Sequence, residues 1–99
     1  MMNQNQIKRL RSEVEKVFDA EPGSSKVKCK AHRYSRARVV FQYCLYKFSG
    51  MGPRAIARLN GGCDHSTVLK NVRNVNRRCQ HDTAYREKVI QVESIIETL

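Results

Sequence analysis

Glycine and proline are confined to a few short stretches of this chain, and that constrains the fold more than any other feature. The two prolines, Pro22 and Pro53, each lie beside glycine, and Gly61-Gly62 forms a third break. Between the breaks, apolar residues recur at steps of three and four, which is the period of an amphipathic helix. No segment sustains the alternation typical of a strand. The pattern therefore predicts an all-α fold.

The breaks and the apolar spacing together predict one domain of five helices in the 99 residues. Ser35, Asp64 and Asp82 carry the side chains preferred at helix N-caps. The expected elements are an opening helix at about 6–19, a basic arm at 26–34, a long helix at 35–48, a short helix at 53–59, a longer helix from 64 to about 78, and a C-terminal helix at 82–98. The residues expected to face the core are Ile7, Leu10, Val14, Val17, Phe18, Val40, Phe41, Cys44, Leu45, Phe48, Ala55, Ile56, Leu59, Val68, Leu69, Val72, Val75, Cys79, Tyr85, Val89, Val92, Ile96 and Leu99.

Positive charge is concentrated in the middle of the chain. The formal net charge is +10, yet residues 1–21 are balanced and residues 83–99 sum to −1. Residues 22–82 hold thirteen Lys and Arg against two acids, Asp64 and Asp82. Such a block is typical of a protein that binds a polyanion, and nucleic acid is the partner we expect. A membrane surface or an acidic protein is the alternative.

The cysteines and histidines do not predict a disulfide framework, a metal site or a catalytic pair. The four cysteines are widely spaced, with no Cys-x-x-Cys pair, and Cys44 and Cys79 fall at helical core spacing. Cys63 and His65 are two residues apart at a helix start, so they would not face each other as a nucleophile and its base. The polar start at residues 1–6 is not followed by the apolar run of a secretory signal. We therefore expect a reducing, cytoplasmic setting, no cofactor and no enzyme activity.

Residues 53–78 have the order of a helix-turn-helix: a short helix, a turn with glycine, and a longer helix. In this motif the second helix enters the major groove of DNA by its N-terminal end. Here that end is Asp64, His65, Ser66 and Thr67, all polar and short. Asp accepts from cytosine, Ser and Thr serve several bases, and the Thr methyl meets the thymine methyl. A helix cap after a glycine stop gives the same residues, so the pattern by itself leaves both interpretations open.

The longer string Gly61-Gly62-Cys63-Asp64-His65-Ser66-Thr67-Val68 resembles a family signature, Gly-Gly-Arg-Asp-His-Ser/Thr-Thr-Val. That signature belongs to the C-terminal DNA-binding domain (domain IV) of the bacterial chromosomal replication initiator DnaA. The resemblance extends over nearly the whole chain from about residue 7, including 36–40 at the start of the long helix and 52–56 at the short helix. It implies a Trp-repressor-like helix-turn-helix that binds double-stranded DNA in replication initiation or its regulation.

The resemblance also implies roles for single residues. Positions 63 to 67 fall on the base-contacting turn and start of the recognition helix. The basic arm would reach the minor groove. The arm residues are Lys28, Lys30 and Arg33, and the residues expected at phosphates are Arg36, Arg38, Pro53, Arg54, Lys70 and Arg73.

Two features depart from the family pattern or from a whole initiator. Cys63 stands where the family has Arg, a residue suited to guanine, and Lys30 aligns with the Arg of the arm. We therefore expect weaker binding to the standard initiator site and an altered target. The chain has no Gly-x-x-x-x-Gly-Lys-Ser/Thr loop, so we expect no ATPase activity and a setting in the cytoplasm of a bacterium or a phage-infected cell. It would be a stand-alone binding module if it is a whole protein, and a DNA-binding part if it is a fragment of a larger initiator.

Three further functions compete with this interpretation. The chain could be a transcriptional regulator or a non-specific nucleic-acid binder. Tyr34, Tyr43 and Tyr46 could stack on single-stranded bases. The charge-balanced first helix and the slightly acidic last helix could instead bind a replication protein or a second copy, as an adaptor would. Binding to DNA should weaken steeply with salt, whereas a contact between helices should not.

Overall fold

The computed structural model describes residues 2–19, 32–59 and 64–99. Within these ranges the chain forms five α-helices and one π-helical turn, and no strand, which confirms the predicted all-α class. The elements are α1 (Gln4–Val17), α2 (His32–Cys44), η2 (Leu45–Ser49), α3 (Pro53–Leu59), α4 (His65–His81) and α5 (Thr83–Ile96). None of these helices has the length and apolar character needed to cross a membrane.

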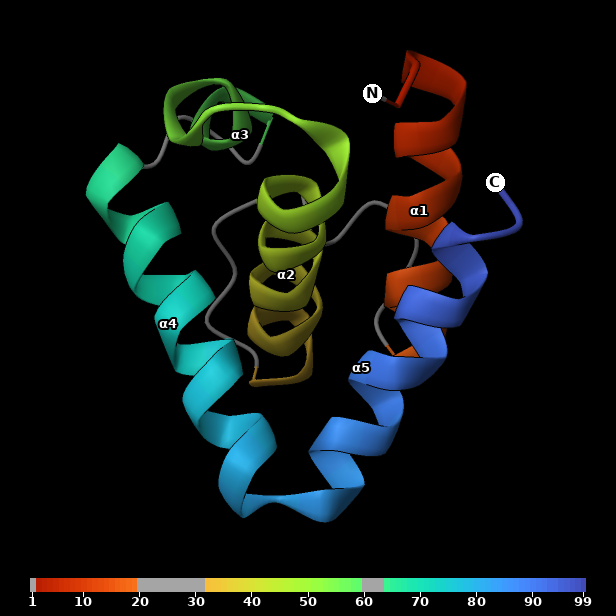
Figure 1. The fold of residues 1–99 in the computed structure, drawn as a ribbon, viewed down its shortest axis with the longest axis vertical. Helices are drawn as coiled ribbons and strands as arrows, with labels where there is room; N and C mark the ends of the chain where they lie inside the picture. The colour runs from red at the N-terminus through yellow and green to blue at the C-terminus, as the bar shows by residue number, and fades with distance from the viewer. Residues whose placement is uncertain (1, 20–31, 60–63) are drawn as a thin grey trace.

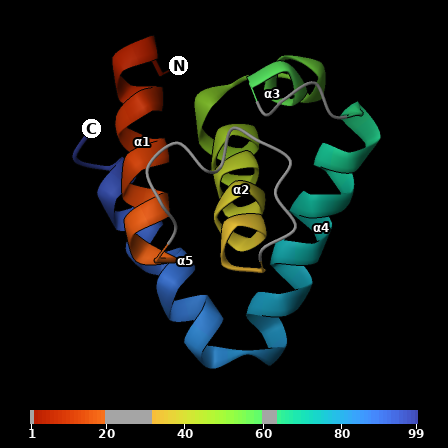
Figure 2. The ribbon, with the colours of Figure 1, turned by 180° about the vertical axis from the view of Figure 1, so that it is seen from behind.

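Helix α2 lies at the centre of the molecule, between α1 and α4 (Figure 1). Helices α4 and α5 diverge from the turn at Asp82, and α3 packs against α4 at the other end of that helix (Figure 1). Seen from behind, α1 lies along α5 (Figure 2). The Gln6 Nε2 donates to the carbonyl of Leu99 at 3.2 Å, so the first and last residues of this bundle are held together.

The core lies where the four longer helices meet. Most of the apolar residues predicted to face it are at most 5% exposed, among them Leu10, Phe41, Val68 and Val92. Others, such as Val72 and Cys79, are partly buried against that core. Burial raises the pKa of Cys44 to about 12, so this thiol stays neutral and packs as a small apolar side chain. The helical spacing therefore identified the core correctly along α1, α4 and α5.

Phe48 was predicted to be buried and is instead 38% exposed, whereas Ser49 is fully buried. The reason is that α2 does not continue as an α-helix to its end but widens into the π-helical turn η2. Hydrogen bonds from i to i+5 add one residue to the turn, which shifts every later side chain by one position. The Ser49 hydroxyl donates to the carbonyl of Leu45, and Gly50 then ends the turn at a φ of 78°, which favours glycine.

The buried face of α3 also differs from the prediction. Ile56 and Ala57 are buried, whereas Leu59 is 37% exposed and Ala55 is only partly buried. Four of the seven residues in this helix are apolar, so its sequence is compatible with more than one inward face. The packing against α4, and not the periodicity, selects Ile56 and Ala57.

Several helix boundaries differ from the predicted ones, three of them with a clear local cause or consequence. Helix α2 begins by His32, so residues 32–34 are helical and do not belong to an arm, and Ser35 is not an N-cap. No glycine or proline interrupts 32–35, so the helix extends through them. Helix α4 likewise continues past Arg78 to His81, and α1 starts at Gln4 because Asn3 and Gln6 form a capping box. The rest of the predicted arm, 26–31, lies outside the described residues.

Candidate functional site

The start of α4 presents four consecutive polar residues, 64–67, to solvent. Asp64 is the N-cap, and its Oδ1 accepts from the backbone N–H of Ser66 at 3.2 Å. The same Oδ1 lies 3.1 Å from Nδ1 of His65. Val68, the next residue, is fully buried and fixes the helix to the core. The Oδ1 atom of Asp64 thus caps the helix and lies beside the His65 ring.

The cap chemistry makes part of the stability depend on pH. The Ser66 backbone N–H lowers the pKa of Asp64 below its ordinary value of 3.8, and the Tyr85 N–H does the same for Asp82, the N-cap of α5. Because the folded pKa values are lowered, this stabilisation is present above the ordinary value and is lost as the pH falls through the lowered values.

We therefore expect the melting temperature of a double variant, Asp64→Asn with Asp82→Asn, to fall less steeply than that of the parent protein as the pH is lowered from about 5 to about 2. Asparagine keeps the capping acceptor and does not titrate in this range. Thermal unfolding followed by circular dichroism against pH measures the difference. If the melting temperature of the variant fell as steeply with pH as that of the parent, this account of the caps would be wrong.

The outward face of α4 is positively charged. Lys70, Arg73 and Arg77 are exposed at spacings of three and four, so they share one side of the helix with Ser66. No acidic residue occurs between His65 and His81. We call Lys70, Arg73 and Arg77 the basic stripe of α4. Two of its members, Lys70 and Arg73, were predicted from the sequence, and Arg77 was not.

The other predicted phosphate contacts are distributed over two ends of the molecule. Arg54, exposed, and Pro53 lie at the start of α3, which packs against α4. Arg36 and Arg38 are partly buried near the start of α2. Arg36 shares a hollow with Arg78, near the end of α4, so the structure does not bring Arg36 to residues 64–67. Lys28, Lys30 and Cys63 lie outside the described residues, and so does the side chain of Arg33.

Two polar contacts that the sequence did not reveal hold the α3 and α4 region in place. Asn71 Nδ2 of α4 donates to Gln42 Oε1 of α2 at 2.7 Å, and Gln42 is only 1% exposed. Arg11 of α1 donates through Nη2 to the carbonyl of Leu59, the last residue of α3, at 3.0 Å. Only weak signs in the sequence indicated that these side chains are buried. Gln42 lies within an apolar stretch of α2, and Arg11 lies beside Leu10 in the apolar stripe of α1. Both side chains link sequence-distant helices across the core.

Comparison with known proteins confirms the resemblance found in the sequence. The chain is 28% identical over 90 residues to the chromosomal replication initiator protein DnaA of Porphyromonas gingivalis, a match that covers 91% of the chain and 19% of that protein. It is 24% identical to the DnaA of Bacteroides thetaiotaomicron and 26% identical to that of Bacteroides fragilis, over 83% of the chain and 17% of each relative. The chain thus spans about a fifth of the length of the curated relatives it matches. No family model matches the chain.

Proposed function

We propose that this chain binds double-stranded DNA in a sequence-specific manner through α3 and α4, which act as a helix-turn-helix. The observation that carries the proposal is the start of α4, where four exposed polar residues, 64–67, precede a basic outward face with no acidic residue between His65 and His81. Helix α3 packs across that start, as the first helix of the motif does. The similarity to a replication initiator supports the same function.

In this proposal α4 is the recognition helix. His65, Ser66 and Thr67 contact base edges in the major groove, together with the Asp64 Oδ2 that helix capping leaves available. The basic stripe and Arg54 contact phosphates beside the groove, and the start of α3 at Pro53 adds a further phosphate contact. Lys28 and Lys30 of the predicted arm, with Arg33 at the start of α2, supply the proposed minor-groove contact. Positioning therefore comes from the cations, and sequence choice from residues 63–67.

We further propose that the chain acts in replication initiation or its regulation, as a binding module that does not itself hydrolyse ATP. Its target differs from the standard initiator site, because Cys63 replaces the arginine of the family signature and a thiol cannot make the bidentate contact to guanine. Selection of bound sequences from a pool of random duplexes identifies the target. Recovery of the standard initiator site as the tightest ligand would contradict the altered specificity.

A pair of single variants on α4 tests the division between specificity and affinity. We expect His65→Ala to lower the affinity for the selected duplex by about 1–3 kcal/mol and to relax the preference at one base pair. Lys70→Ala, one turn further along and exposed, is expected to weaken the binding of all duplexes by a similar factor. Fluorescence anisotropy with the selected duplex and with single-base variants measures both effects. If the two variants behaved alike on every duplex, the proposed roles would be wrong.

A further inference from the structure

A second polar feature lies at the end of α4 that is opposite to residues 64–67. A hollow of about 180 Å³ is enclosed between α2, α4 and α5, and its polar lining comes from Arg36, Asn71, Asn74, Arg78 and Tyr85. A smaller hollow of about 70 Å³ adjoins it and adds Asp82 and Lys88 to the walls. Asn74 and Arg78 are about 14 and 20 Å along α4 from His65, at about 1.5 Å per residue. The hollow is therefore distinct from the proposed base-reading residues.

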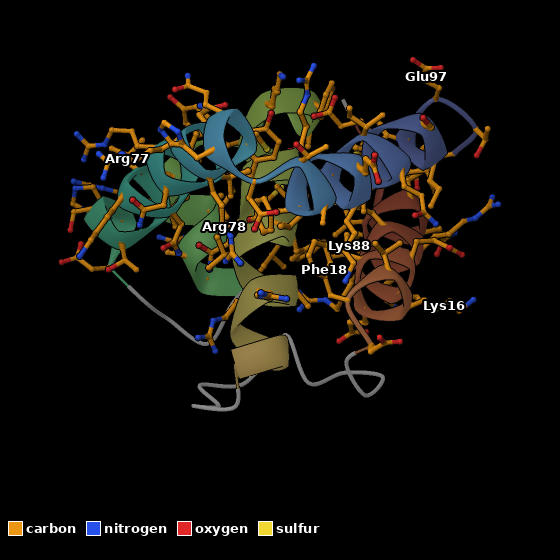
Figure 3. The ribbon with its side chains drawn as sticks, turned by 90° about the horizontal axis from the view of Figure 1, so that it is seen from below. Lys16, Phe18, Arg77, Arg78, Lys88 and Glu97 are labelled. Carbon is orange, nitrogen blue, oxygen red and sulfur yellow. The ribbon has the colours of Figure 1, made fainter. Side chains whose placement is uncertain are left out.

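The charges around this hollow leave a net excess of positive charge. Arg36, Arg78 and Lys88 contribute three cations and Asp82 one anion. The Arg78 Nε lies 3.6 Å from Asp82 Oδ2, and the Arg78 guanidinium stacks on the Tyr85 ring with its centre 4.4 Å from the ring centroid. These two contacts fix Arg78 on the wall, and Asp82 lies in the smaller hollow and not in the larger one. Figure 3 shows Arg78 and Lys88 on the inner side of α4 and α5, whereas Arg77 extends away from the bundle.

Arg36, which lines this hollow, has a buried donor with no hydrogen-bond partner among the described residues. The Arg36 Nε is buried and makes no hydrogen bond to any of the described residues. A buried cationic N–H without an acceptor is costly, and in folded proteins such groups are satisfied by water or an ion. Asn71 and Asn74 add amide groups that can also donate. The lining thus offers several hydrogen-bond donors around a positively charged space. The donor that has no acceptor among the described residues belongs to the guanidinium of Arg36.

We infer that this hollow binds a single phosphate group, held by Arg36 and Arg78 and oriented by Asn74. Guanidinium groups match phosphate oxygens in charge and geometry. The volume selects the size of the ligand, because about 180 Å³ is well below the roughly 300–1,000 Å³ of pockets that enclose larger molecules. The group is either free inorganic phosphate or one phosphate of a DNA backbone that passes the α2 side of α4.

Proton–nitrogen NMR spectra of the arginine Nε–Hε groups test this assignment on the whole chain. In one arm inorganic phosphate is added at constant ionic strength, with chloride as the balancing anion. In the other arm a duplex is added in phosphate-free buffer. Saturating shifts of Arg36 and Arg78 in the first arm, with Arg77 unaffected, identify a site for free phosphate. A shift of the buried Arg36 Nε with duplex alone identifies a backbone phosphate.

Unchanged Arg36 and Arg78 signals in both arms would overturn the inference, and so would shifts that rise linearly and equally for Arg36, Arg77 and Arg78. The phosphate arm contains no DNA, so its result does not depend on the proposed function. Arg78→Met keeps an apolar contact with Tyr85 and is expected to weaken phosphate binding about tenfold, the loss of one charged hydrogen bond. Arg86→Met removes the same charge from an exposed position of α5 that lines neither hollow and is expected to leave phosphate binding unchanged.

Discussion

Replacing Arg11 with methionine is expected to lower the free energy of unfolding by about 3 kcal/mol. Arg11 is only 7% exposed, donates to the carbonyl of Leu59, and holds its guanidinium 4.2 Å from the centroid of the Phe41 ring. Methionine fills much of the same volume but cannot donate a hydrogen bond or stack as a cation. It also removes the positive charge that interacts with the buried carboxylate of Glu15. Urea denaturation measures the change.

Two further variants separate the causes of that loss. Arg9→Met removes an exposed arginine from the same helix and is expected to change stability by less than about 0.5 kcal/mol. Adding Glu15→Gln to Arg11→Met is expected to restore part of the loss, because the double variant no longer buries the carboxylate whose interaction with Arg11 has been removed. If Arg9→Met and Arg11→Met were equally destabilised, burial of Arg11 would not be the source of its contribution.

The affinity for duplex DNA is expected to fall at least about a hundredfold when the basic stripe is removed by Lys70→Ala, Arg73→Ala and Arg77→Ala together. Each side chain that neutralises a phosphate releases counterions, so the slope of log affinity against log salt should decrease in magnitude by about 3. All three residues are exposed, so the fold should not depend on them. Anisotropy titrations at four or more salt concentrations give both quantities.

A charge-matched control comes from α1, where Lys8, Arg9 and Lys16 are also exposed. Their joint replacement by alanine removes the same formal charge from a helix that the proposal does not place on DNA. The expected salt slope is close to that of the parent protein. Equal slopes for the two triple variants would mean that binding follows total charge, and the proposed recognition face would then be wrong.

The parts of the fold that follow local rules could be predicted from the sequence. Asp64 and Asp82 were identified as N-caps because a cap needs one short acceptor and the backbone that follows it. The apolar stripes of α1 and α5 were correct because their periodicity is continuous over several turns. Residues 64–67 were predicted as a site from the helix-turn-helix pattern and the resemblance, and the structure adds that they are exposed at a helix start.

The errors and omissions depend on interactions between distant or competing groups. Phe48 was misplaced because a helix that changes its hydrogen-bond spacing cannot be recognised from apolar periodicity. Arg11 and Leu59 are separated by 48 positions, so no sequence spacing connects them. Arg36 was predicted as a phosphate contact at the start of the long helix, and this role stays a prediction. Its position beside Arg78 follows from how α2 packs against α4, which composition does not reveal.

The turn η2 also determines where the chain can change its length. A π-helical turn contains one residue more than an α-helical turn that covers the same span. Loss of one residue from Leu45–Ser49 would convert the turn to ordinary helix and leave the residues on either side in their present register. Single-residue losses among related chains are therefore expected to collect at this turn, since three of its five residues, 46–48, are exposed and the register of α2 before the turn is unchanged.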